Sequence, residues 1–171
     1  MFSKLEDFIE TWHAETSSTV KTLDAIPDAS AEQGVVEGHR TLKRLAWHIV
    51  ECLIEIPGHC GLQVDGHEKF KNIGFDDPPK TMAEIKAAYQ KASSSLLQCL
   101  KAWNDETLQI EDEMYGERFK RGATLTMLLT HEIHHRGEMF VLMRQAGLVP
   151  PGIYGPTKEG WASMGMEPPR V

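Results

Sequence analysis

The sequence predicts an all-α fold, a four-helix bundle formed by one domain of residues 1–171. Four stretches carry apolar residues at spacings of three and four, the pattern of a helix with one buried face. The alternation of apolar and polar residues that would predict strands is weak throughout. A length of 171 residues is ordinary for one domain. Because amphipathic helices must pack on one another, we expect four helices, long loops and an irregular C-terminal tail.

The first two helices are predicted to end at prolines. Apolar residues recur at helical spacing over residues 3–26, and Pro27 follows them. A polar loop that contains glycine comes next. The helical pattern returns over residues 41–56, where Pro57 and Gly58 end it.

The third helix is predicted to follow a long loop of about residues 58–80 that is rich in Gly, Asp and Pro. Thr81 has the side chain of an N-cap, and Glu84 stands three residues later, as a capping box requires. The helical pattern continues to near Trp103. Residues 107–120 alternate only weakly, and we expect a loop there with a short extended piece.

The fourth helix is predicted to run from an N-cap at Thr124 to about Ala146. Gly147 is a natural residue for the position after a helix end. Pro150 and Pro151 then prevent the helix from continuing. The remaining residues are expected to form the irregular tail.

The composition argues against two classes of partner. The net charge is −7 and the basic residues are scattered, whereas nucleic-acid binding needs clustered Lys and Arg. No apolar run approaches the roughly 18 residues of a membrane span, and acidic residues stand where a secretory signal would be basic. The three cysteines fit free thiols of a reducing compartment better than a disulfide framework. We therefore expect a cytoplasmic protein without nucleic-acid or membrane partners.

Three of the eight histidines lie within residues 131–135 of the fourth predicted helix. At about 100° per residue, His131 and His135 fall about 60° and 20° from Leu128, within or beside the apolar stripe. His134 falls about 120° away, on the outer side. Helical phase therefore turns His131 and His135 toward the interior, one turn apart, where two imidazoles can reach one metal ion.

A third inward imidazole is predicted on the second helix. His48 lies about 60° from Leu45, at the edge of that helix's apolar stripe. Three histidines hold a metal ion while leaving a position open for water or substrate, and they suit Zn²⁺, Ni²⁺, Fe²⁺ or Cu²⁺. Glu138 or Glu55 could orient an imidazole by accepting its second N–H. The alternative that these histidines are only hydrogen-bonded core residues stays open.

Residues 131–135 also spell HExxH, the motif of zinc proteases in which Glu132 would be the general base. That architecture takes its third ligand from downstream, and no histidine follows His135. The downstream carboxylates of suitable reach, Glu159 and Glu167, lie in the Gly- and Pro-rich tail. A metal-dependent hydrolase of the HExxH type is therefore a minor alternative.

The chain resembles the DinB-like family of bacterial four-helix metalloproteins. The matching segments are LAWHI at residues 45–49, HEIHHRGE at residues 131–138 and GLVPPGIYGP at residues 147–156. The resemblance implies an up-down-down-up bundle, frequent homodimers and a metal held by one histidine of the second helix and an HxxxH pair of the fourth. These positions are His48, His131 and His135. Members often have Gln at the position of Glu138, and a carboxylate there is expected to act as a base, hold a water or pair with Arg136.

The resemblance also implies a type of activity. Characterised relatives include thiol-dependent S-transferases and isomerases that use bacillithiol or mycothiol, and some hydrolases. We therefore expect a metal-dependent enzyme of the thiol S-transferase type that acts on a small molecule, with zinc or nickel, a low-molecular-weight thiol and Glu138 as a catalytic residue. The alternative is a non-catalytic dimeric bundle that binds a metal or a ligand.

Overall fold

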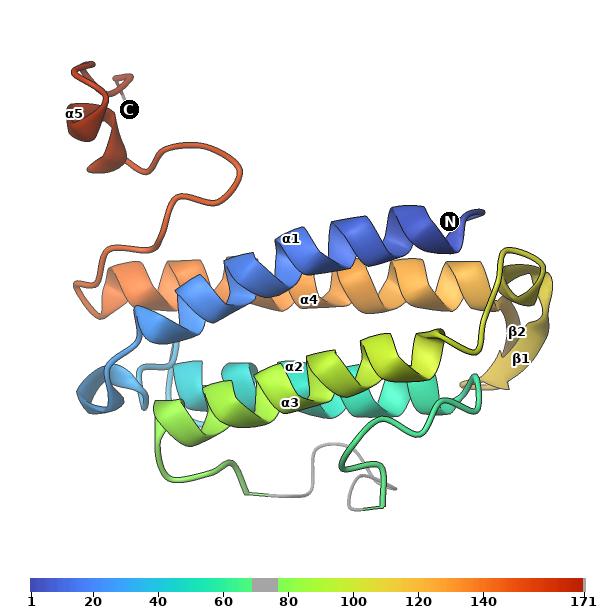
Figure 1. Cartoon of the computed structure of the whole chain (residues 1–171). Coiled ribbons are helices and arrows are strands. Elements are labelled where there is room, and N and C mark those ends of the chain that lie inside the picture. Colours follow the sequence, from blue (N-terminus) through green and yellow to red (C-terminus); the bar gives the residue numbers. More distant parts are fainter. Residues whose placement is uncertain (69–76, 171) are drawn as a thin grey trace.

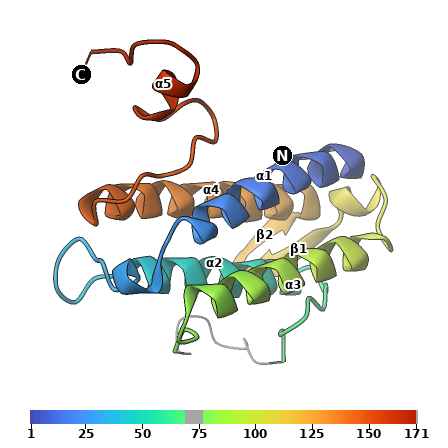
Figure 2. The same cartoon turned by 60° about the vertical axis from the view of Figure 1, so that its left-hand side comes forward.

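The computed structural model describes residues 1–68 and 77–170, and four long helices make up most of it (Figure 1). Helices α1 and α4 run in one direction and α2 and α3 in the other, the up-down-down-up order that the family resemblance implies (Figures 1 and 2). Both α1 and α2 pack against α3 and α4. The long helices are α1 (Leu5–Asp24), α2 (Leu42–Gly58), α3 (Met82–Leu100) and α4 (Arg121–Gln145). The short ones are the 3₁₀ helices η1 (Asp28–Ser30) and η2 (Thr107–Gln109) and the α-helix α5 (Gly160–Ser163).

The all-α prediction is wrong in one respect, because a small antiparallel sheet precedes α4. Strand β1 (Glu111–Met114) pairs with β2 (Glu117–Lys120). Tyr115 and Gly116 join them with φ angles of 55° and 82°, and two successive positive φ angles form the tight turn that suits a hairpin. Because most residues of both strands are at least partly exposed, their alternation in the sequence is weak. The register pairs Glu111 with Lys120, Asp112 with Phe119, Glu113 with Arg118 and Met114 with Glu117.

The hairpin determines where α4 begins. Strand β2 leads directly into the helix, and the Arg121 N–H donates to the Ile110 carbonyl oxygen at 2.9 Å. The predicted N-cap at Thr124 is therefore wrong. Thr124 lies in the first turn of α4, and its hydroxyl donates to the Lys120 carbonyl oxygen at 3.5 Å.

Local signals determine the other helix ends much as predicted. Thr81 and Glu84 form the expected capping box at the start of α3. Gly147 follows α4 with a φ of +74°, the left-handed conformation that glycine adopts most easily. Helix α2 continues through Pro57, past its predicted end at Ile56, because the φ of proline suits a helix and only its missing N–H is lost. Part of the predicted loop of residues 58–80 lies outside the described residues.

The most buried helix is α2, in which every residue from Leu45 to Ile54 is buried. This segment packs against α3 and α4 in the centre of the hydrophobic core. It therefore carries His48, Glu51 and Cys52 into the interior, where polar groups need partners. None of the helices in the described part of the chain is both long and apolar enough to cross a membrane.

The chain after α4 is irregular, as predicted, except for α5. Figures 1 and 2 show α5 standing away from the four long helices. Tyr154 and Glu159 of this segment contact the long helices: the Tyr154 hydroxyl donates to a Glu15 carboxylate oxygen of α1 at 2.6 Å, and Glu159 pairs with Arg144 of α4 at 2.7 Å.

Candidate metal centre

Three imidazoles from two helices meet in the interior of the bundle. His131 and His135 lie one turn apart on α4, with their Nε2 atoms 3.0 Å apart. His48 of α2 faces them, and its Nε2 atom is 3.4 Å from that of His131. One ring nitrogen of each residue lies within 4.8 Å of the other two. The structure thus brings together the three histidines that helical phase selected.

A second group of possible ligands lies nearer the surface. It consists of His134, His135 and Glu138, with ligand atoms again within 4.8 Å of one another. The His134 side chain is 65% exposed, as its helical phase predicts. Because His134 and Glu138 are exposed and stay hydrated without a metal, this group needs a ligand less than the group of two buried histidines and the half-buried His131.

Hydrogen bonds within the buried group cannot satisfy all of its ring nitrogens. The Nε2 atom of His131 faces nitrogens of both His48 and His135. A neutral imidazole nitrogen carries either one proton or one lone pair, so it can pair with only one of them. A metal cation that accepts a lone pair from each ring would satisfy all three. With Zn–N bonds of about 2.1 Å, tetrahedral ligands lie about 3.4 Å apart, which is close to the observed spacing.

The surroundings keep the two rings of α4 neutral. Burial, with the neighbouring His135 and His48, lowers the pKa of His131 to about 4. Burial also lowers the pKa of His135, although the hydrogen bond to Glu138 opposes this. At pH 7 both rings therefore offer the lone pairs that a metal ion requires.

Two carboxylates face the outer nitrogens of the rings. The His135 Nδ1–H donates to Glu138 at 2.6 Å, which leaves its Nε2 atom free to face the other histidines. The buried Glu51 carboxylate lies 3.6 Å from Nδ1 of His48. Glu55, which helical phase suggested for such a role, forms its hydrogen bonds elsewhere. The histidine clusters found in zinc sites commonly have such carboxylate partners.

Glu132, the middle residue of the HExxH sequence, lies on the other side of α4. Its carboxylate accepts hydrogen bonds from the hydroxyls of Thr19 at 2.6 Å and Tyr89 at 2.8 Å. These partners belong to α1 and α3, whereas His48 belongs to α2. This geometry removes Glu132 from the position of a general base beside the histidines.

We expect Glu132→Gln to change the pH dependence of stability without changing metal content. Burial raises the pKa of Glu132 above its ordinary value of 4.5. Because the carboxyl binds its proton more tightly in the folded state than in the unfolded state, it stabilises the fold fully below about pH 4.5. This stabilisation is lost as the pH rises through the higher pKa of the folded state. Urea unfolding at several pH values should show this loss in the unmodified protein and a flatter profile in the variant. Metal loss in the variant would instead indicate that Glu132 acts at the metal centre.

Cys52 is the neighbour of the histidines that the sequence interpretation missed. Its Sγ atom lies 3.3 Å from Nε2 of His131 and 3.5 Å from Nε2 of His48. From the sequence it was expected only to be a free thiol, like the other two cysteines. The signal that could have revealed it is its spacing of four residues from His48, the same spacing that joins His131 and His135.

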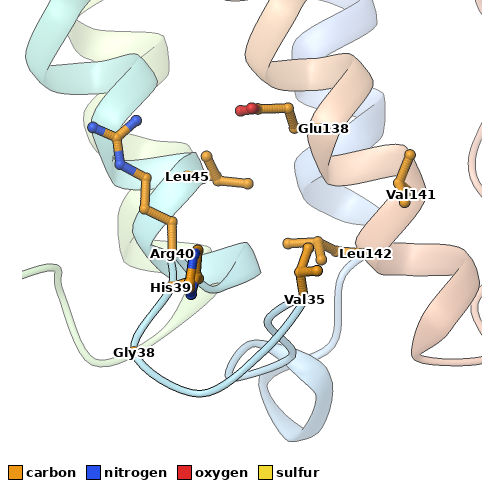
Figure 3. A pocket seen from close by; sticks show the side chains of 8 residues that line it. All are labelled: Val35, Gly38, His39, Arg40, Leu45, Glu138, Val141 and Leu142. Atoms are coloured by element: carbon orange, nitrogen blue, oxygen red, sulfur yellow. The ribbon is translucent and has the colours of Figure 1, made fainter.

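A cavity of about 540 Å³ lies between the start of α2 and the later part of α4 (Figure 3). Glu138 belongs both to its wall and to the hydrogen bond with His135. Figure 3 shows Arg40 and Glu138 on opposite sides, one from the start of α2 and one from α4. The cavity is therefore linked to the histidine group through Glu138, while His48, His131 and His135 themselves do not line it. Its other lining residues are Val35, Gly38, His39, Leu45, Val141 and Leu142.

The chain is similar to known proteins over nearly its whole length. Residues 1–170 match the model of the DinB family. The uncharacterized protein YrdA of Bacillus subtilis (strain 168) is 40% identical over 173 residues, with 100% of both chains covered. The crystal structure of a DinB-like protein from Bacillus cereus ATCC 10987 is 37% identical with a TM-score of 0.82, covering 90% of this chain and 100% of that one. The DinB-like protein YjoA of Bacillus subtilis, at 16% identity and a TM-score of 0.67, covers 87% of this chain and 98% of its own and shows a shared fold.

Proposed function

Because this chain belongs to the DinB family, we propose that it is a metal-dependent enzyme whose metal is held by His48, His131 and His135. The observation that supports this most is the convergence of three imidazole nitrogens that cannot all be satisfied by one another. Imidazole ligands suit Zn²⁺ or Ni²⁺, and a three-histidine set leaves a coordination position for water or substrate.

The reaction that we propose is transfer of a low-molecular-weight thiol to a small electrophile. A bound metal ion supplies a Lewis acid beside which a thiol exists as its thiolate at neutral pH. The thiol loses its S–H proton, its sulfur bonds to the electrophile, and the leaving group departs with the bonding electrons. We propose Glu138 as the acceptor of this proton, because it lies in the cavity wall and is ionised at pH 7: burial opposes its ionisation, but the hydrogen bond to His135 lowers the pKa of this carboxyl.

The cavity beside Glu138 is the proposed substrate site. Its wall is mainly aliphatic, and Arg40 adds a positive charge at one side. The positive charge of Arg40 also acts on His131, because it contributes to the low pKa of that ring, after burial and the neighbouring histidines. A small molecule with an apolar body and an anionic group matches this lining.

We expect Arg40→Ala to weaken binding of an anionic substrate while leaving the chemical step unchanged. Losing one charge-assisted contact at an exposed position corresponds to about a tenfold rise in KM with kcat unchanged. Steady-state kinetics on a substrate found by screening measures this, with Arg40→Lys as the charge-conserving control. A drop in kcat at unchanged KM would place Arg40 in the chemistry instead.

The non-catalytic alternative is supported by one observation, the thiol of Cys52 beside two of the three histidines. A fourth protein ligand is typical of structural zinc sites, which have no exchangeable water.

We propose a homodimer whether or not the protein is an enzyme. Light scattering coupled to size-exclusion chromatography measures the mass of the assembly and so tests this.

The test is a turnover screen of the metal-loaded protein with thiol cosubstrates and small electrophiles. We expect transfer activity that disappears with a chelator and returns when Zn²⁺ or Ni²⁺ is added back. Activity that survives removal of the metal would contradict a metal-dependent reaction. Full metal occupancy without turnover of any thiol–electrophile pair would favour the non-catalytic alternative.

A further inference from the structure

Helices α2 and α4 present matched pairs of side chains to the same point. On α4 the pair is His131 and His135, and on α2 it is His48 and Cys52, each pair separated by one turn. The Cys52 sulfur lies 3.3 Å from Nε2 of His131 and 3.5 Å from Nε2 of His48. The same two nitrogens belong to the buried imidazole group.

A buried cysteine is usually a small apolar residue, and Cys60 provides the comparison. Both cysteines are buried, with 4% and 3% of their surface exposed. Cys60 lies near the hydroxyl of Thr124 and the carboxylate of Asp112, which are ordinary partners for a buried thiol. Cys52 instead faces nitrogens of two imidazoles, and one S–H proton can satisfy only one of them. Ordinary hydrogen bonding therefore explains Cys60 but leaves the surroundings of Cys52 unexplained.

We propose that Cys52 is a fourth ligand of the metal, so that the centre has three nitrogens and one sulfur. This inference rests on the proposed metal site and adds a ligand to it. Binding replaces the thiol proton with the metal ion, and the proton leaves to solvent. A thiolate ligand favours Zn²⁺ and other transition metals over Mg²⁺ or Ca²⁺. Because zinc can expand to five ligands, a substrate could still approach from the cavity.

Cobalt(II) substitution tests the proposal without depending on activity. The apoprotein, titrated with Co²⁺, is expected to show visible d–d absorption from the bound ion and a near-ultraviolet band from charge transfer between thiolate and cobalt. Cys52→Ser should lose the charge-transfer band, keep d–d absorption from the three histidines and bind Co²⁺ about tenfold or more weakly. Cys60→Ser, the matched variant of the other buried cysteine, should keep both features.

The outcomes separate this proposal from the proposed function. If the unmodified protein shows no d–d absorption, the metal site itself is rejected. Visible absorption without a charge-transfer band, or a band that survives in Cys52→Ser, would overturn Cys52 ligation while leaving the three-histidine site in place.

A second measurement needs no variant. Alkylation of the unmodified protein, followed by peptide mapping, should show that bound Zn²⁺ protects Cys52 and leaves the reactivity of Cys99, a partly exposed free cysteine, unchanged. Because Cys52 is only 4% exposed, the reaction is continued until Cys52 of the apoprotein is modified; equal alkylation with and without Zn²⁺ would then contradict the proposal even if Cys52→Ser failed to fold.

Discussion

Replacing His48, His131 and His135 together by alanine is expected to reduce bound metal from about one equivalent per chain to near zero. The three rings supply the nitrogens of the buried group, and without them one thiol and flanking carboxylates remain. Zinc and nickel analysis of the purified protein, after loading and removal of free metal, measures the change. Circular dichroism of the variant checks that the helices still form.

The matched control for this experiment is His134→Ala. His134 belongs to the same sequence cluster, but its side chain is exposed and lies outside the buried group. It should therefore retain the metal content of the unmodified protein. Loss of metal in this variant, with retention in His48→Ala, would place the ion in the exposed group of His134, His135 and Glu138 and contradict the buried site.

Arg136→Ala is expected to destabilise the fold by about 3–5 kcal/mol, because it leaves a buried carboxylate without its cation. Arg136 is only 2% exposed and forms an ion pair with Glu15 of α1, which is 8% exposed. Its Nη1 atom also donates to the Thr19 hydroxyl at 3.0 Å, and its Nη2 atom donates to Tyr154 of the C-terminal segment. One side chain thus joins α4 to α1 and to the tail.

The control for Arg136→Ala is Arg144→Ala on the same helix. Arg144 pairs with Glu159 on the surface, where both side chains are more than 40% exposed. Exposed pairs contribute little to stability because water screens their attraction, so this variant should remain close to the unmodified protein. Urea unfolding followed by circular dichroism compares the two. If the two variants lost similar free energy, the buried ion pair would not be the interaction that holds α1 to α4.

Helical phase was enough to predict that three imidazoles face the interior, because the positions of His131, His135 and His48 around their helices depend only on residues within a few turns. The same local information predicted the capping box at Thr81 and the end of α4 at Gly147. It failed at the hairpin before α4, since exposed strands produce little alternation and the conformation of Tyr115 is stabilised by the paired strands around it.

The hydrogen-bond and ion-pair partners of the polar residues could not be predicted from helical phase. Arg136 was considered as a partner for Glu138, but it pairs with Glu15, while Glu138 accepts from His135. Glu132, a general base by its motif, is held by hydroxyls of α1 and α3. In each case the partner is far away in the sequence, and spacing along one helix says nothing about it.

The sequence alone therefore determined four amphipathic helices, most of their ends and three inward-facing histidines, because periodicity and capping are local. The tertiary structure decided that the histidines meet at one point, that Cys52 joins them and that a cavity is lined by Arg40 and by Glu138, the hydrogen-bond partner of His135. These features depend on how α2 is rotated and placed against α4. That arrangement results from packing the whole core, to which distant segments contribute together.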